Sequence, residues 1–352
     1  MANIDCNSEI NKYHSSEVVL LKFQQDEMRS RRDNGRIRLE NGLTNADHPL
    51  PYLVSFQGSY AMRTMIQDDE NDYDIDDGVY FEYDDLVDIH GYELEPKAAR
   101  KRVKKALYDE RLSFDAEVKN NCVRQYYPQG YHIDLPVYRT TWSHDYLGNE
   151  TIKHELASGD EWVISDARSV TQWFNSHVTQ ELKSGDADAS QLRKVVRLTK
   201  KMARSRKAWK TKTTSGICIT KLVVDHMVYV IGRDDEALRT TWRAIKNVLF
   251  ISRVIKHPVQ SNNLSEWDDE AVGFFKDCLS ENLKHLEVLD KSDCNQEMAM
   301  KAWNKAFDTD YFSDYISDNK SAASLLQPAS LAVAGLSFPN KPIVPNKSSG
   351  FA

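Results

Sequence analysis

A run of alternating aspartates constrains this chain more than any other feature of its sequence. Residues 72–80 read DYDIDDGVY, a β-prone stretch in which three carboxylates would project from one side of a strand: Asp72, Asp74 and Asp76. Carboxylates this close repel one another, and a divalent cation between them is the usual remedy. A Gly-Ser turn upstream, at residues 58 and 59, suits a phosphate group. The pattern predicts Mg²⁺-dependent chemistry on a nucleoside triphosphate.

The composition argues against several classes of protein. The 352 residues carry a formal net charge of −7, which disfavours a dedicated duplex-binding protein. No apolar run is long enough to span a bilayer, and the first residues do not resemble a secretory signal. The five cysteines are widely spaced and include no CxxC pair, as expected of free thiols in a reducing compartment. We expect a cytoplasmic protein with no membrane partner and no obligate nucleic-acid partner.

The pattern of elements predicts an α+β fold, with a mixed or antiparallel sheet in the first half and helices in the second. A long helix is expected over residues 16–41, with a break near 33–35, and a short helix over 61–66. The expected strands cover residues 73–83, 115–124 and 131–138, and Pro96 starts a helix that continues over 97–107. The later helices are expected from residue 165 and over 190–209, 215–231, 235–255, 268–288 and 295–307.

These elements divide the chain into three expected regions. Residues 1–165 would form a catalytic core that includes the long N-terminal helix, and residues 166–335 a helical domain that completes a cleft. Residues 336–352 are rich in proline, serine and lysine and are expected to form a flexible tail.

A third carboxylate further along the chain completes the expected metal site. Asp74 and Asp76 stand at i and i+2 and can bridge two metal ions, and Asp134 can join them from a neighbouring strand. Two such ions hold an attacking hydroxyl and a leaving oxygen in line. His132 shares a strand face with Asp134 and is expected to be a structural neighbour of the site.

Other charged residues near these motifs are expected to be solvated. Asp68, Asp69 and Asp72 are interpreted as loop charges, and Asp77 as a residue that shapes the turn before Gly78 or accepts from a backbone amide. The basic stretch over residues 193–212 has an apolar stripe, so most of its cations are expected on the wet face of a helix.

The order of these motifs resembles the nucleotidyltransferase superfamily of polymerase-β type. Four segments are similar, more narrowly, to the bacterial CD-NTases, on the branch of the bacterial cyclic GMP-AMP synthase, which is related to cGAS and oligoadenylate synthase. The segments read DIDDGVY, HIDLPVY, SGDEWVISDARSVTQWFN and LRKVVRLTKKMAR, and the resemblance spans roughly residues 57–225. A lone Gly-Ser or DxD motif would be weak evidence for this family, whereas the order of the motifs together with Asp134 is strong evidence.

The resemblance implies a role for individual residues. Asp74 and Asp76 would bind both metal ions, and Asp134 would bind the catalytic ion and help deprotonate the acceptor hydroxyl. The implied nucleotide contacts are Gln57, Gly58, Ser59 (on the donor phosphates), Tyr60, Arg124, Lys200 and Ser215. Lys201 competes with Lys200 for the triphosphate, and the spacing of Arg124 from Asp134 departs from the family pattern.

The resemblance also implies a reaction and its partners. The enzyme would use two Mg²⁺ ions, with Mn²⁺ as an alternative, to join ATP and GTP into a cyclic di- or trinucleotide of the cyclic GMP-AMP type. Pyrophosphate would leave, and an effector would bind the product in CBASS antiphage defence. An E1/E2-like enzyme would conjugate the tail at Ala352, unless that end is simply frayed. The alternative is a nucleotidyltransferase that modifies an RNA 3′ end or a protein, because the carboxylate triad serves both reactions.

Overall fold

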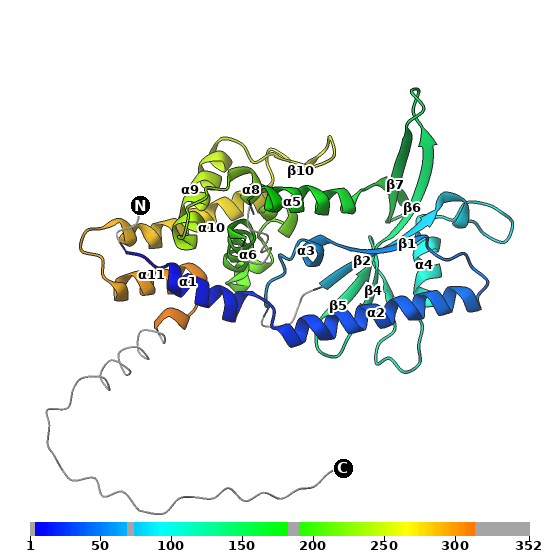
Figure 1. Cartoon of the computed structure of the whole chain (residues 1–352), viewed down its shortest axis with the longest axis horizontal. Coiled ribbons are helices and arrows are strands. Elements are labelled where there is room, and N and C mark those ends of the chain that lie inside the picture. The colour runs from blue at the N-terminus through cyan, green and yellow to red at the C-terminus, as the bar shows by residue number, and fades with distance from the viewer. Residues whose placement is uncertain (1–3, 69–73, 182–189, 314–352) are drawn as a thin grey trace, which may run out of the picture.

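The computed structural model describes residues 4–68, 74–181 and 190–313 of the chain. They form two lobes, a sheet lobe and a helical lobe, which lie side by side along the long axis in Figure 1. Within these residues no helix has both the length and the apolar character that crossing a bilayer requires. The prediction of an α+β fold with a mixed sheet and a helical second half is confirmed.

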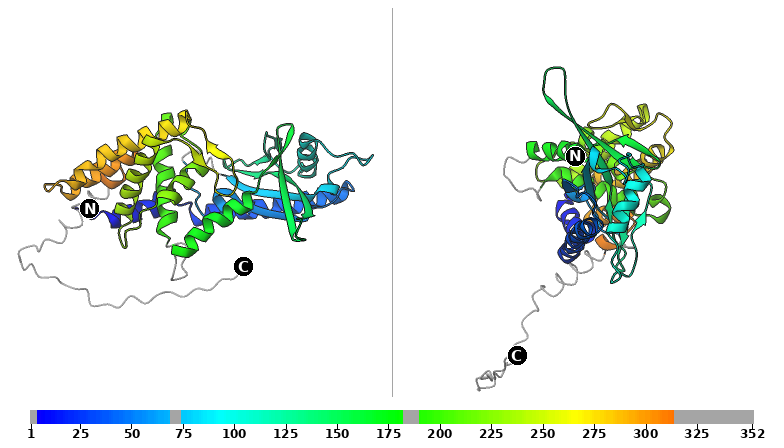
Figure 2. Two further views of the ribbon diagram at one scale, coloured as in Figure 1. Left: turned by 90° about the horizontal axis from the view of Figure 1, so that it is seen from above. Right: turned by 90° about the vertical axis from the view of Figure 1, so that its right-hand side faces the viewer.

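A mixed eight-stranded sheet forms the sheet lobe, in the order β3-β4-β5-β2-β6-β7-β8 with β1 beside β2. The strands are β1 (Leu53–Gln57), β2 (Asp74–Glu82), β3 (Glu117–Val118), β4 (Val123–Tyr126), β5 (His132–Leu135), β6 (Val137–His144), β7 (Glu150–Ser158) and β8 (Glu161–Ile164). The β6–β7 hairpin projects beyond the rest of this lobe (Figure 2).

Proline divides the strand that was expected over residues 131–138. The two parts, β5 and β6, both run parallel to β2, with Asp76 opposite Asp134 and Val79 opposite Val137. Pro136 has no N–H to donate to the ladder. Its carbonyl still accepts from the N–H of Val79 at 2.8 Å, so the register of the two parts is the same.

Two helices cover the sheet, α2 (Lys22–Asn45) and α4 (Pro96–Ala106), and Pro96 occupies the first turn of α4 as predicted. The predicted break near residues 33–35 is wrong, because α2 runs through Gly35 without interruption. Leu39 is buried against the sheet, and Arg36 donates to Asp77 of β2 from its Nε at 2.7 Å. These contacts beside Gly35 outweigh the helix penalty of one glycine, about 1 kcal/mol.

The helical lobe contains most of the remaining helices and one short hairpin. They are α5 (Ala167–Glu181), α6 (Gln191–Arg204), α7 (Lys207–Lys210), α8 (Gly216–His226), α9 (Asp234–Ile251), β9 (Ile255–Lys256), β10 (Asn263–Ser265), α10 (Glu270–Leu286) and α11 (Gln296–Phe307). Their buried side chains form one core, separate from the core between the sheet and its helices.

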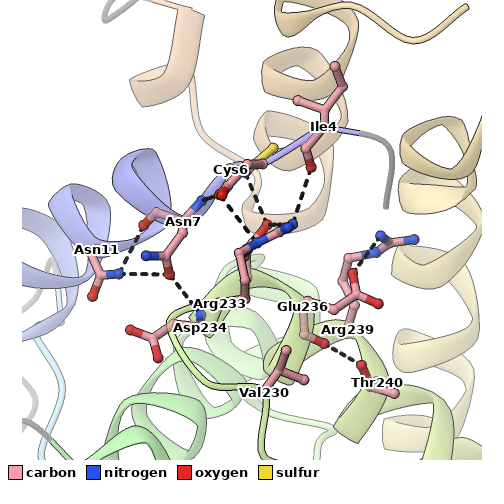
Figure 3. Close-up of polar contacts among 12 residues, drawn as sticks. Ile4, Cys6, Asn7, Asn11, Val230, Arg233, Asp234, Glu236, Arg239 and Thr240 are labelled. Carbon is pink, nitrogen blue, oxygen red and sulfur yellow. Dashed lines mark hydrogen bonds and ion pairs between the residues drawn. The ribbon is translucent and has the colours of Figure 1, made fainter. Parts of the chain in front are cut away.

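The first helix of the chain, α1 (Asn7–Tyr13), packs into the helical lobe, although α2 after it covers the sheet. The ring of Tyr13 lies 4.8 Å from the ring of Phe307. Figure 3 shows the polar contacts of the same segment with the start of α9. There the N–H of Cys6 donates to Asp235 at 3.0 Å, and the N–H of Asp234 donates to Asn7 at 2.7 Å. The N-terminal segment therefore ties the two lobes together.

The prediction of a short helix over residues 61–66 is wrong. Helix α3 (Gly58–Ala61) instead begins at the Gly-Ser turn and ends where that helix was expected to start. The carbonyls that follow are bonded to side chains of α6: Met62 accepts from Arg193, Arg63 from Arg197 and Thr64 from Lys200. With these carbonyls satisfied from another element, the segment needs no helical hydrogen bonds.

The crossing of α2 and α4 requires a glycine at position 42. A Cβ added to Gly42 would collide with the backbone of Ala106 in α4, whereas one added to Gly35 would lie 3.7 Å from the flexible side chain of Arg38. We expect Gly42→Ala to lower the free energy of unfolding by about 1–3 kcal/mol, as overpacking typically does. Gly35→Ala, in the same helix, is the matched control and should be neutral or stabilising. Urea denaturation of the two variants checks this, and equal stability of both would contradict it.

Candidate active site

Four of the predicted site residues form one row across the sheet. Gln57 of β1 pairs with Asp76 of β2, Asp76 pairs with Asp134 of β5, and Asp134 pairs with Arg124 of β4. Asp74 stands two residues before Asp76, opposite His132. Because side chains two apart on a strand share a face, Asp74, Asp76 and Asp134 meet on one side of the sheet. The register of two neighbouring strands, β2 and β5, therefore builds the acidic centre.

The Gly-Ser turn packs directly against this centre. Gly58 has a φ of +64°, and a Cβ placed there would collide with the carboxylate of Asp76. Glycine is thus required both for the left-handed conformation and for the close approach. The turn brings Ser59 and the start of α3 beside Asp74 and Asp76 on the wall of a cleft.

The acidic centre is short of positive charge. Burial, and then repulsion from Asp134, raises the pKa of Asp74, and burial with repulsion from Asp74 and Asp134 raises the pKa of Asp76 well above its ordinary value. One guanidinium is close: Arg124 donates to both carboxylate oxygens of Asp134 at 2.7 Å. A cation between Asp74 and Asp76 would relieve the repulsion that remains.

The donor set fits a divalent metal ion. Asp74, Asp134 and His132 each place one ligand atom within 4.8 Å of the others, and Asp76 adjoins Asp134 in the register. Carboxylate oxygens are the ligands that Mg²⁺ and Mn²⁺ prefer, and an imidazole also suits first-row transition ions. His132 was expected to be only a neighbour of the site, and the structure places its ring among the candidate ligands.

Helix α6 forms the opposite wall of the cleft with buried cations. The prediction that most cations of residues 193–212 face solvent is wrong for Arg193 and Arg197, because both are buried. Their guanidiniums donate to the carbonyls of Met62 and Arg63 at 3.0 and 2.8 Å. The hydrophobic stripe predicts that one face of α6 is buried. The face that carries these cations is buried only because the two lobes pack together.

Lys200, not Lys201, is the lysine that lines the cleft. Its ammonium group donates to the hydroxyl of Thr64 at 3.1 Å, and burial followed by repulsion from Arg204 lowers its pKa to about 7. The ammonium group of Lys201 donates instead to the carbonyl of Gln67 at 3.4 Å.

Arg204 is a cleft residue that the sequence analysis missed. It lies one helical turn after Lys200, is exposed and lines the cleft. In the part of the chain that the structure describes, its guanidinium has no hydrogen-bond or ion-pair partner. The spacing i, i+4 from Lys200 could have identified it, because residues so spaced share a helix face.

The cleft has a volume of about 410 Å³ and continues from the acidic centre between α5, α8 and β9. Its walls also include Asp166, Val170, Ile217 and His257, none of which was predicted as a site residue. Such a cavity, lined by both charged and apolar side chains, can hold a ligand with both a phosphate part and a flat ring.

The remaining predicted contacts do not line the cleft. The amide of Gln57 is buried and donates to the hydroxyl of Tyr138 at 3.0 Å, so it supports the sheet. Tyr60 lies against Arg32 and Phe56. Ser215 caps α8 by accepting from the N–H of Cys218 at 3.4 Å. Ala352 lies outside the described residues.

Two neighbouring aspartates, Asp77 and Asp68, form ion pairs with basic side chains. Asp77 is buried and accepts from the guanidinium of Arg36, so it anchors α2 and does not simply shape a turn. The expectation that Asp68 is solvated is wrong, because its carboxylate is largely buried and pairs with Lys210 at 2.9 Å. Asp69 and Asp72 lie outside the described residues.

Comparison with known proteins defines the class of the fold. Residues 53–138 match the family model described as the nucleotidyltransferase domain of cyclic GMP-AMP synthase DncV-like proteins. CdnC of Escherichia coli MS115-1, solved with ATP, has a TM-score of 0.65 at 16% identity, over 88% of this chain and 99% of CdnC. DncV of Vibrio cholerae, solved with the linear intermediate pppA(3′,5′)pG, has a TM-score of 0.68 at 17% identity, over 87% of this chain and 96% of DncV.

These matches confirm the family resemblance that the motifs indicated. Residues 53–138 form a DncV-like nucleotidyltransferase domain, and the described chain has the fold of the bacterial CD-NTases. The matched domain makes the protein an NTP nucleotidyltransferase.

The acidic centre predicts which carboxylates hold a metal ion. We expect Asp76→Asn to weaken Mn²⁺ binding by about 10-fold or more, since even supporting residues cost that much at metal sites. Asp77→Asn changes the adjacent carboxylate, which pairs with Arg36, and should leave Mn²⁺ affinity unchanged. Electron paramagnetic resonance of free Mn²⁺ measures both. Unchanged Mn²⁺ affinity in Asp76→Asn would rule this centre out.

The buried lysine predicts a pH dependence of stability. The pKa of Lys200 is about 7 in the folded protein, against about 10.4 for an unfolded lysine. Between these values the unfolded chain binds one more proton, so this group destabilises the fold less as the pH rises. Relative to Lys200→Met, the wild type should therefore gain stability from pH 7 to pH 9.5. Urea denaturation at both pH values measures the difference, with Lys201→Met as the control for losing a lysine, and a constant difference would contradict the expectation.

Proposed function

We propose that this protein joins nucleoside triphosphates into a cyclic di- or trinucleotide second messenger. One observation carries the proposal: the strand register brings Asp134 beside Asp74 and Asp76, and these two line a cleft together with Lys200 and Arg204. An acidic wall suits a metal ion, and a cationic wall suits the phosphates that the ion accompanies. The proposal agrees with the names of its structural neighbours, since DncV was solved with a linear dinucleotide and CdnC with ATP.

The proposed reaction uses both the acidic and the cationic wall of the cleft. The 3′-hydroxyl of one nucleotide attacks the α-phosphate of the other, the new phosphodiester bond forms and pyrophosphate leaves. Asp134 would accept the hydroxyl proton, and Lys200 and Arg204 would hold the triphosphate. A second round of the same attack closes the linear intermediate into a ring. The protein itself mainly positions the reactants and neutralises their charge.

The metal ions in this proposal are two Mg²⁺ ions held by Asp74, Asp76 and Asp134. When bound, they supply charge neutralisation and a lower pKa for the attacking hydroxyl. Arg124 stays beside Asp134 and can contact a nucleotide once the carboxylate is shared with an ion. Ser59 and Gly58 line the cleft with Asp74 and Asp76 and would contact the donor phosphates.

The wider role is inferred from the same family. We propose ATP and GTP as substrates, a mixed guanine-adenine product and a function in CBASS antiphage defence, where an effector protein binds the product. A protein partner is consistent with the solved complex of CdnC with a HORMA protein, which has a TM-score of 0.62 to this chain at 16% identity. Conjugation of Ala352 by an E1/E2-like enzyme belongs to the same proposal.

A product assay tests the proposal. Purified protein incubated with the four α-³²P-labelled nucleoside triphosphates and Mg²⁺ should release pyrophosphate and form a phosphatase-resistant product, whose mass identifies its bases and ring size. The double change Asp74→Ala with Asp76→Ala should abolish the product. The control Asp84→Ala with Asp85→Ala removes two carboxylates just after the same strand, which do not line the cleft, and should retain it. Label found only in linear products, in RNA or in protein would overturn the proposal.

A further inference from the structure

The side chain of Gln57, the last residue of β1 before the Gly-Ser turn, is held at both ends by tyrosines. Its Oε1 accepts from the hydroxyl of Tyr80 at 3.1 Å, and its Nε2 donates to the hydroxyl of Tyr138 at 3.0 Å. All three side chains are buried, and Gln57 does not line the cleft. Both polar ends of the amide are therefore engaged within the protein, although the family resemblance implies that Gln57 contacts the nucleotide.

The glycine at position 78 of β2 makes room for this bridge. The rings of Tyr80 and Tyr138 are stacked, with centroids 4.4 Å apart and planes 5° from parallel. A Cβ added to Gly78 would come within 2.7 Å of Gln57 Oε1 and within 2.9 Å of the ring of Tyr80. Because Gly78 has no side chain, both rings and the amide can approach the strand closely, and the two hydroxyls reach Gln57.

The bridge lies next to the acidic centre. Gln57 stands opposite Asp76 in the register of β1 and β2, and side chains of directly opposed residues share a face. The next residue, Gly58, turns the chain with a φ of +64°, and the carboxylate of Asp76 occupies the space of its missing Cβ. The backbone that the tyrosines hold through Gln57 is therefore the backbone against which the Asp76 carboxylate packs.

We propose that Gln57 is a positioning residue for the acidic centre and makes no contact with the nucleotide. Its bridge to Tyr80 and Tyr138 fixes the end of β1, so that the Gly-Ser turn holds the carboxylate of Asp76 in place for a metal ion. Burial raises the pKa of both tyrosines, that of Tyr138 to about 12, so both hydroxyls stay protonated at neutral pH. The inference rests on the acidic centre being a metal site and does not require a cyclic product.

Mn²⁺ binding to the nucleotide-free protein separates the two roles of Gln57, because a nucleotide contact cannot act there. Gln57→Met keeps the length of the side chain and removes both hydrogen bonds. We expect it to weaken Mn²⁺ binding about 10-fold, the low end for residues that orient metal ligands. Electron paramagnetic resonance of free Mn²⁺ measures the affinity.

Changes to the tyrosines test whether Gln57 acts through its bridge. The double change Tyr80→Phe with Tyr138→Phe leaves Gln57 in place without its two partners, and neither tyrosine lines the cleft. It should weaken Mn²⁺ binding by the same factor as Gln57→Met. Adding Gln57→Met to the double change should cause no further loss, because residues that act as one unit are not additive. If the double variant does not fold, Tyr138→Phe alone should still weaken Mn²⁺ binding, and an unchanged affinity would overturn the inference.

Gln125→Met is the matched control for the loss of a buried glutamine. Gln125 lies in β4, and its Nε2 donates to the carbonyl of Phe114 at 2.7 Å. Side chains alternate along a strand, so Gln125 is on the face opposite to that of Arg124, which pairs with Asp134 in the acidic centre. Gln125→Met should lower the midpoint of urea denaturation, as Gln57→Met does, and leave Mn²⁺ affinity unchanged. An equal loss of Mn²⁺ affinity in both variants would show general destabilisation and overturn the positioning role.

The remaining outcomes separate this inference from its alternatives. Unchanged Mn²⁺ affinity in Gln57→Met, with weaker binding of a non-hydrolysable nucleoside triphosphate, would overturn it in favour of a direct nucleotide contact. A loss that the double tyrosine change does not reproduce, or that multiplies when the changes are combined, would overturn the role of the bridge. A protein that shows the expected Mn²⁺ affinities but forms only linear products would contradict the proposed cyclic product and support the positioning role.

Discussion

The hydrogen bonds between α6 and the segment after the Gly-Ser turn hold the two lobes together around the cleft. Arg193, Arg197 and Lys200 donate to three successive residues, Met62, Arg63 and Thr64. Hydrogen bonds to charged groups contribute about 1.5–3 kcal/mol each, roughly twice the neutral value. The segment connects the turn that would hold phosphates to the strand that carries Asp74 and Asp76. Because three cationic side chains of α6 donate hydrogen bonds to this segment, the two walls of the cleft are fixed with respect to each other.

The same packing sets the electrostatics of the cleft. On the sheet side, burial and mutual repulsion raise the pKa values of Asp74 and Asp76, and on the α6 side burial lowers the pKa of Lys200. The ionised carboxylates of one wall are destabilised because they lack a neighbouring cation. The ammonium form of Lys200 on the other wall is destabilised because it lacks a neighbouring anion. Opposed shifts of this kind, in one cleft, are typical of functional sites. A nucleoside triphosphate with its metal ion would supply both missing charges at once.

Much of the acidic centre could be predicted because its geometry is local. A spacing of two residues on a strand places Asp74 and Asp76 on one face, and the same alternation orients Asp134 within its own strand. Two local interpretations were wrong for tertiary reasons. The glycine of α2 does not break the helix, because Arg36 and Leu39 are anchored beside it. Arg193, Arg197 and Lys200 of α6 do not face water, because they donate to the carbonyls of a distant segment.

The sequence by itself determined the chemistry of this protein, a carboxylate triad and a Gly-Ser turn in the order of a nucleotidyltransferase, because strand alternation and glycine conformation act within a few residues. Only the tertiary structure decided that Lys200 and not Lys201 lines the cleft, and that Arg204 and His257 line it too. Those outcomes depend on contacts between segments far apart in the chain, α6 with residues 62–67 and the β9–β10 hairpin with β8. Spacing along the sequence carries no information about such contacts, because packing between elements sets them.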